Sequence, residues 1–62
     1  MNEPIKKRRL ALGLRQEDLG RLAGVTQASV SMIERDLHEG RHVRRHIIRA
    51  LDEAERSRSR IR

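Results

Sequence analysis

The spacing of apolar residues along the chain predicts four short helices. Within four segments an apolar residue recurs every three or four positions, and polar or charged residues fill the positions between. This spacing places the apolar side chains on one face of a helix. The predicted helices cover residues 5–12, 16–23, 27–35 and 43–55. We therefore expect an all-α domain over residues 1–55.

A tight turn joins the second and third predicted helices. The apolar stripes on its two sides consist of Leu19, Leu22, Ala23, Val30 and Ile33. Gly24 can adopt a positive φ, and Thr26 can cap the third helix by accepting a backbone N–H. Gly20 has no side chain, which allows the two helices to approach closely at their crossing. Two short helices joined in this way form a helix-turn-helix.

The charge of the chain indicates a polyanionic partner. Among the 62 residues, 15 are Lys or Arg and 9 are Asp or Glu, which gives a formal net charge of +6. Thirteen of the 15 basic residues are Arg, whose planar guanidinium suits phosphate and guanine. So large a basic excess favours nucleic acid over an anionic membrane.

The absence of cysteine and of aromatic residues excludes some kinds of site and of nucleic-acid binding. The chain has no Cys, which excludes disulfides and thiolate metal sites, and no aromatic residue, which argues against single-strand or RNA binding by base stacking. Duplex DNA is therefore the favoured nucleic acid.

No run is long enough to span a membrane, and no signal-peptide core is present, so we expect a cytoplasmic protein. No nucleophile–base arrangement or phosphate loop is visible, so we predict neither enzymatic activity nor a cofactor.

Three histidines raise the possibility of a metal site. His38, His42 and His46 follow an i, i+4 spacing, which would place ligands on one face of a continuous helix. Gly40 interrupts any helix between the first two, and the nearby carboxylates are not placed to complete a site. We therefore predict surface histidines and no metal.

The segment around the turn resembles the Cro and repressor family of phage regulators, also called XRE or lambda-repressor-like. The positions that carry the resemblance are Arg9, Gly13, Leu14, Gln16, Leu19, Ala23, Gly24, Val25, Gln27, Val30, Ile33 and Glu34. It covers roughly residues 5–55 and implies a compact four-helix lambda-repressor-like domain with the helix-turn-helix at helices 2 and 3. The chain departs from relatives at Arg15, where a capping residue is usual, and at Asp36, which stands near a usual Gly.

The resemblance also implies roles for individual residues. Arg9 and Glu34 would form a structural salt bridge, Gln27 would contact a base, and Gln16 would contact phosphate. Since the remaining outward positions of the third helix can also reach bases, the predicted base-reading residues are Gln27, Ala28, Ser31 and Met32. Their alternative is a solvated surface.

Charged and polar residues near the motif are candidates for phosphate contact. The predicted phosphate-binding residues are Arg15, Gln16, Ser29, Arg35, Arg41 and Arg44. Ser29 could instead bond to its own helix end, and each arginine could be merely solvated. Lys6, Lys7 and Arg8 are expected to point outward, either as a solvated face or as further phosphate contacts.

We predict a homodimer on a palindromic operator, because the resemblance implies one and because a single domain offers too few base contacts for high specificity. Candidate dimer segments are residues 43–48, with Ile48 beside the apolar stripe, and the segment after Leu51.

Residues 56–62 alternate Arg with polar residues, so we expect a disordered tail that wraps the minor groove or flanking phosphates. The predicted function is transcriptional repression. The alternatives are a protein-interaction module, such as an antitoxin or adaptor, and a nonspecific architectural DNA binder.

Overall fold

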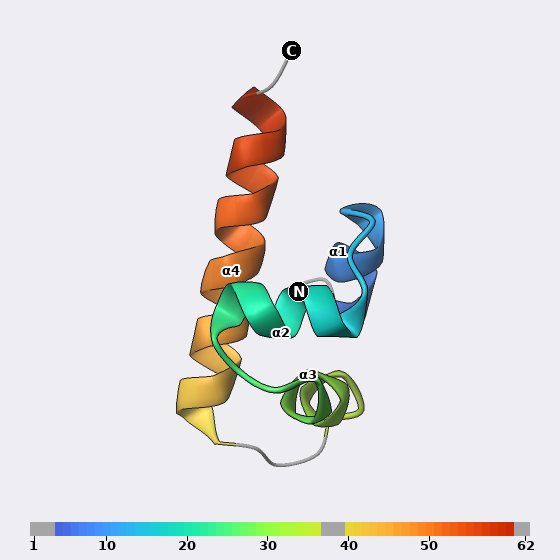
Figure 1. Ribbon diagram of the computed structural model, residues 1–62, viewed down its shortest axis with the longest axis vertical. Helices are drawn as coiled ribbons and strands as arrows, with labels where there is room; N and C mark the ends of the chain where they lie inside the picture. The colour runs from blue at the N-terminus through green and yellow to red at the C-terminus, as the bar shows by residue number, and fades with distance from the viewer. Residues whose placement is uncertain (1–3, 37–39, 61–62) are drawn as a thin grey trace.

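A computed structural model of the chain describes residues 4–36 and 40–60, which form four α-helices (Figure 1). The helices are α1 (Ile5–Ala11), α2 (Gln16–Ala23), α3 (Gln27–Glu34) and α4 (Arg41–Arg60). Helix α3 lies across α2, and the longer α4 runs along one side of the molecule. The described residues contain no strand, and the predicted all-α fold is confirmed.

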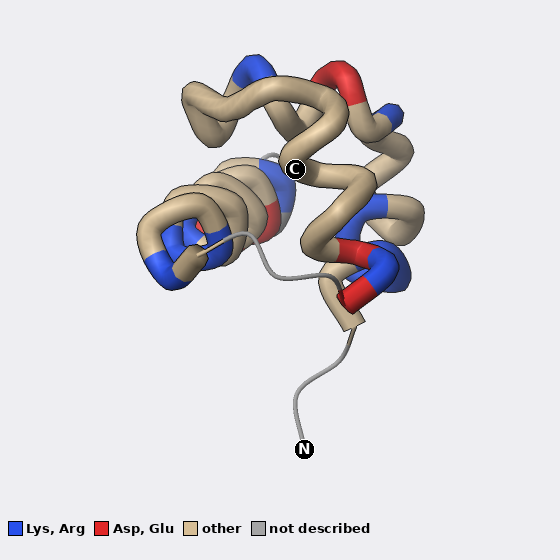
Figure 2. The backbone as a smooth tube through the Cα atoms, turned by 90° about the horizontal axis from the view of Figure 1, so that it is seen from below, with Lys and Arg blue, Asp and Glu red and all other residues tan. Residues whose placement is uncertain are grey.

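The core forms where α2 meets both α3 and α4. The buried apolar residues are Ile5, Leu19, Val30, Ile33, Ile47, Ala50 and Leu51. Figure 2 looks nearly along α4, which stands beside the unit formed by the first three helices. Because the fully buried Leu19 of α2 belongs to the same core cluster as Val30 of α3 and Ile47 of α4, the helix-turn-helix is anchored by the rest of the chain.

The prediction that Leu22 belongs to the buried stripe of α2 is wrong. Its side chain is 58% exposed, whereas Leu19 and Gly20 are both buried. A helix turns about 100° per residue, so Leu22 lies about 110° around α2 from the midpoint of that buried pair. The stripe that packs is therefore rotated away from Leu22.

The turn between α2 and α3 has the geometry that its sequence predicts. Gly24 adopts a φ of 75° at the end of α2, and the Val25 backbone N–H donates to the Gly20 carbonyl oxygen over 2.9 Å. Thr26 Oγ1 accepts the Ser29 backbone N–H over 3.0 Å and caps α3. These bonds fix the direction in which the first turn of α3 leaves α2.

The start of α2 lacks a side-chain cap, as the sequence predicts for Arg15. A guanidinium has no acceptor atom, so it cannot take a free backbone N–H. Asp18 provides part of the missing stabilisation, because its carboxylate accepts the Arg15 backbone N–H over 2.9 Å. Hydrogen bonds from the Arg15 side chain and backbone lower the pKa of Asp18 to about 2.

Helix α4 is longer than the sequence predicts. It begins at Arg41 instead of residue 43 and continues through Arg60, so the prediction of a disordered tail is wrong for residues 56–60. Once a helix has formed, each added residue gains a backbone hydrogen bond, and arginine is a good helix former even without an apolar face. Arg58 also donates to the Ala11 carbonyl oxygen over 2.6 Å. Residues 61–62 lie outside the described part of the chain.

Helix α1 is tied to α4 by Arg8, whose predicted outward position is wrong. Lys6 and Lys7 are exposed, but the Arg8 guanidinium lies 2.7 Å from Asp52 and 2.8 Å from Glu55. These hydrogen bonds raise the pKa of Arg8 and lower that of Glu55. The two carboxylates stand three positions apart on α4 and so face the same side.

Candidate nucleic-acid interface

Helix α3 presents an uncharged side to solvent, with both polar and apolar residues. The predicted base-reading residues, which share the side of α3 opposite its buried residues, are Gln27, Ala28, Ser31 and Met32. Gln27 and Ala28 are exposed in its first turn, whereas Ser31 and Met32 are half-buried further along. Residues at the start of an exposed helix are those that reach base edges when the helix end enters a groove. The structure thus presents Gln27 more openly than Ser31 or Met32.

Ser29 takes part in the cap of its own helix. Besides the bond from its backbone N–H to Thr26 Oγ1, the two side-chain oxygens lie 3.0 Å apart and share a hydrogen bond. Ser29 is half-buried. Of the two roles that the sequence suggests for it, the structure shows the bond to its own helix end.

A buried ion pair joins α1 to the last residue of α3. Arg9 donates from Nε to Glu34 Oε2 over 2.5 Å and from Nη2 to Oε1 over 3.2 Å. The two side chains are only 8% and 3% exposed. Burial by itself would raise the pKa of Glu34, but the hydrogen bonds from Arg9 and Gln16 hold it below its usual value. The structure therefore brings together the two residues that the resemblance pairs.

The same carboxylate holds the side chain of Gln16. Its Nε2 donates to Glu34 Oε1 over 3.0 Å, while Arg9 Nη1 donates to the Leu14 carbonyl oxygen over 2.8 Å. This network fixes the side chain at the start of α2, where unpaired backbone N–H groups favour an anion. An amide nitrogen carries two hydrogens, so Gln16 keeps one for a further acceptor.

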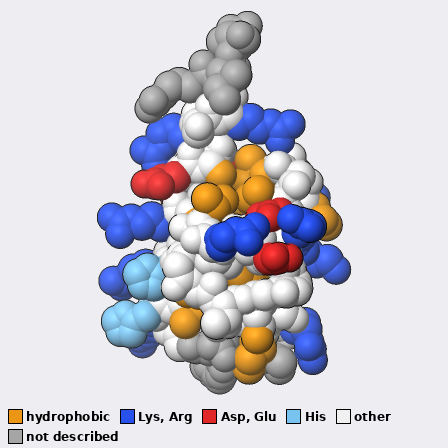
Figure 3. All heavy atoms as spheres, viewed as in Figure 1, with side chains coloured by type: hydrophobic (Ala, Val, Ile, Leu, Met, Phe, Trp, Pro, Cys, Tyr) orange, Lys and Arg blue, Asp and Glu red, His pale blue; other side chains and the backbone are white. Residues whose placement is uncertain are grey.

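The four arginines predicted to contact phosphate come from separate places in the fold. Arg15 directly precedes α2, Arg35 directly follows α3, and Arg41 and Arg44 lie in the first turn of α4; all four are exposed. Basic side chains line the flank that α4 forms in the space-filling view (Figure 3). Arg15 is partly neutralised, because its guanidinium lies 3.2 Å from Asp18.

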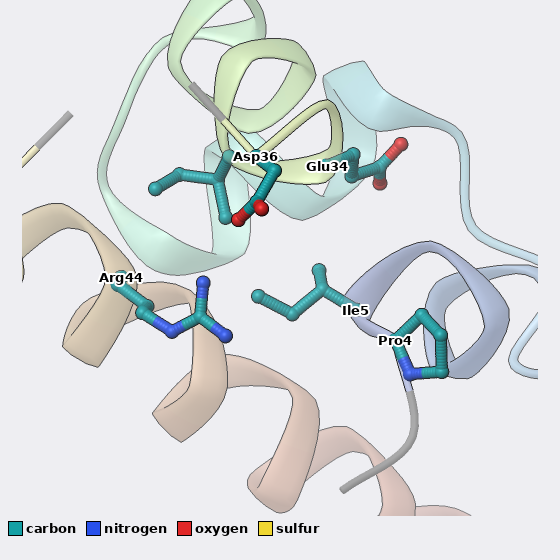
Figure 4. A pocket seen from close by; sticks show the side chains of 6 residues that line it. Pro4, Ile5, Glu34, Asp36 and Arg44 are labelled. Atoms are coloured by element: carbon teal, nitrogen blue, oxygen red, sulfur yellow. The ribbon is translucent and has the colours of Figure 1, made fainter. Parts of the chain in front are cut away.

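Arg44 lies at a small cavity of about 180 Å³ between α1, α3 and α4. Figure 4 shows its guanidinium directed toward this cavity, with Asp36 and Ile5 on the other sides. Asp36, the residue near the usual Gly, adopts a φ of 63°, a conformation that Asp tolerates better than most residues. The structure thus separates Arg44 from the residues at the start of α3.

Two contacts between α1 and α4 were not predicted from the sequence. The sequence contains a feature that could have predicted the contact of Arg8, because Asp52 and Glu55 form an acidic pair on one face of the predicted fourth helix. The bond from Arg58 to Ala11 had no such feature, because it depends on a helix that continues past its last apolar residue.

The described residues provide neither a metal site nor a membrane span. They contain no group of three side chains that could hold a metal ion; His42 and His46 are exposed on α4, and His38 lies outside the described residues. No helix among them is long and apolar enough to cross a membrane.

The fold and the exposed start of α3 define a helix-turn-helix protein. A family model described as helix-turn-helix matches residues 5–54. The chain therefore belongs to this family, in its Cro and repressor (XRE) branch, and is a DNA-binding regulator whose partner is double-stranded DNA. No curated protein and no solved structure matches the chain.

Proposed function

We propose that this regulator is a sequence-specific repressor that places α3 in the major groove of a palindromic operator as a homodimer. The observation that carries the proposal is the exposed, uncharged first turn of α3, with Gln27 and Ala28 open to solvent on a scaffold fixed by buried contacts. A rigid helix end with short polar and apolar side chains suits the reading of base edges.

Each exposed side chain on α3 has a matching chemistry in the major groove. The Gln27 amide can donate to adenine N7 and accept from N6–H₂. Ala28 and Met32 can contact a thymine methyl group, and Ser31 can donate to or accept from either base type. We therefore expect the half-site to contain an A·T pair opposite Gln27.

Phosphate contacts would set the register of α3 in the groove. The Gln16 amide and the backbone N–H groups at the start of α2 can hold one phosphate, and Arg15 and Arg35 add charge nearby. Such contacts release counterions, so affinity should fall steeply with salt.

Two copies would be needed for specific binding, since one such domain reads only a few base pairs. The proposed dimer segments remain residues 43–48, where Val43 and Ile48 are half-buried, and the segment after Leu51, where Ala54 is half-buried. A dimer that occupies a promoter would repress transcription by excluding other proteins from it.

The test is selection of duplexes from a random pool at near-physiological salt, read out by sequencing. The parent chain, Gln27→Ala and a control, Ser57→Ala on the exposed end of α4, would be compared. We expect the parent and the control to enrich the same palindrome, and Gln27→Ala to lose preference at one A·T position by about tenfold.

Other results would replace the proposal. Salt-sensitive binding without enrichment in the parent would indicate backbone-only DNA association, as in an architectural protein. Absence of DNA binding, with a stoichiometric protein partner in its place, would indicate an interaction module. An enriched site without symmetry would rule out the palindromic dimer.

A further inference from the structure

The first half of α4 concentrates positive charge. Residues 41–49 contain four arginines and two histidines but no Asp or Glu. By contrast, α3 contains no basic residue at all. A strongly basic stretch of the described chain therefore lies on α4, outside the helix-turn-helix.

This concentration is unfavourable for the isolated domain. The start of a helix carries the positive end of the helix dipole, and the first turn of α4 has no acidic residue to balance it. Arg41, Arg45 and Arg49 repeat at i, i+4, so their like charges repel across successive turns. None of the three forms an ion pair or a side-chain hydrogen bond with a described residue, whereas Arg8 and Arg9 both do. A polyanion would relieve this repulsion.

These three arginines form what we call the α4 ridge: Arg41, Arg45 and Arg49. They are exposed on the side of α4 opposite Ile47 and Leu51, which are fully buried against the other helices. The ridge therefore points away from the packed side of α4. Successive members are about 6 Å apart along the helix axis, because each residue adds about 1.5 Å.

We infer that the α4 ridge binds the phosphate backbone of a second DNA duplex while α3 holds the first. The inference rests on the proposed DNA contact through α3. Because Ile47 and Leu51 turn the inner side of α4 onto the other helices, the ridge faces away from the helix-turn-helix, and our inference places it outside the first duplex. The protein would then bridge two duplexes, or two distant segments of one DNA molecule.

The composition of the ridge distinguishes DNA from other occupants. A second copy of the chain would bring Arg45 and Arg49 against their own counterparts, and this repulsion opposes a symmetric contact there. Protein interfaces usually have an apolar centre, yet the exposed side around the ridge carries only charged and polar residues, with Ile48 half-buried at its edge. A regular line of arginines matches a regular line of phosphates. The proposed dimer contact would then fall in the segment after Leu51.

The experiment is two-duplex capture. A biotinylated duplex is immobilised and saturated with protein, and a second, fluorescent duplex of the same sequence is then added. The parent is compared with Arg45→Gln/Arg49→Gln and with a control, Lys6→Gln/Lys7→Gln, which removes the same charge from the exposed face of α1. Circular dichroism melts check that all variants fold.

We expect the parent and the control to capture the second duplex, and the ridge variant to capture it about tenfold less. The ridge variant should bind the immobilised duplex within about twofold of the parent. Its residual capture should show a salt slope smaller by about two, because two phosphate contacts are lost.

Three results would overturn the inference. Undiminished capture by the ridge variant would assign bridging to the two α3 helices of a dimer. Equal loss of first-duplex and second-duplex binding would place the ridge on the same duplex as α3. Binding of one duplex without capture by the parent would refute the ridge and leave the proposed function standing, whereas failure to bind any duplex would refute both.

Discussion

Replacing Glu34 by Met should test how much the buried ion pair stabilises the domain. The substitution removes the carboxylate that neutralises Arg9 while keeping similar side-chain volume. Since Arg9 is 8% exposed and Glu34 only 3%, the remaining guanidinium would stay buried without a counter-ion. Removing one partner of a buried pair typically costs about 3–5 kcal/mol. Arg9 keeps its bond to the Leu14 carbonyl oxygen, so we expect the lower value, about 3 kcal/mol.

This loss is large for so small a domain. A chain of 62 residues is expected to unfold with a free energy of roughly 3–9 kcal/mol. A loss of about 3 kcal/mol corresponds to a fall in Tm of about 12–24 °C for a domain of this size. The Glu34→Met variant should therefore be at least partly unfolded at physiological temperature.

Urea denaturation followed by circular dichroism measures the effect in a double-mutant cycle. The series consists of the parent, Glu34→Met, Arg9→Met and the double variant. Replacing both members of a buried pair by apolar residues leaves no unpaired charge, so the double variant should be more stable than either single variant. Glu53→Met serves as the control, because Glu53 is exposed and forms no ion pair with a described residue; it should change stability by less than about 0.5 kcal/mol.

A Glu34→Met variant as stable as the control would refute the stabilising role of the buried ion pair. Losses from the two single variants that simply added in the double variant would refute it as well. Additivity would show that the two charges are stabilised independently, by solvent or by other residues.

Three further predictions follow from the packing and the charges. Gly20→Ala should destabilise the domain by about 1–3 kcal/mol, because the added Cβ would lie 2.9 Å from the Val25 carbonyl oxygen. Ala normally stabilises a helix relative to Gly, so a raised Tm would contradict this prediction. Arg8→Met should lower the free energy of unfolding, measured by urea denaturation, by only about 1 kcal/mol, because its carboxylate partners are about half exposed and solvent screens the pair. A much larger loss would argue against solvent screening. Folding lowers the pKa of Asp18 to about 2 and also lowers the pKa of Glu34. The stability that the two carboxylates contribute is therefore complete above their unfolded-state pKa values of about 4 and is lost as the pH falls through their lower folded-state values. Melting curves recorded at decreasing pH below about 4 should show a falling Tm, and a constant Tm would refute the assignment.

The helix-turn-helix could be predicted from the sequence because its determinants are local. Gly24 permits a positive φ, Thr26 caps the next helix through a residue three positions away, and apolar spacing marks the helices on both sides. The resemblance added the pairing of Arg9 with Glu34, which no local rule provides. Which of the α3 side chains read bases stays a prediction from the helical period.

Other features depended on contacts between distant segments. Leu22 fits an apolar stripe by spacing, but the rotation of α2 against α3 and α4 leaves it exposed. Arg8 belongs to a basic run that looks solvated until α4 brings two carboxylates within reach.

By itself the sequence determined the class of fold, the turn and the positive charge, because spacing, glycine conformation and composition act within a few residues or over the whole chain. Only the tertiary structure decided where that charge lies. Helix α4 continues to Arg60, although no apolar stripe marks its end, and packing of Ile47 inward directs Arg45 and Arg49 outward. The physical reason is that a side chain's exposure depends on which face of its helix the neighbouring helices cover.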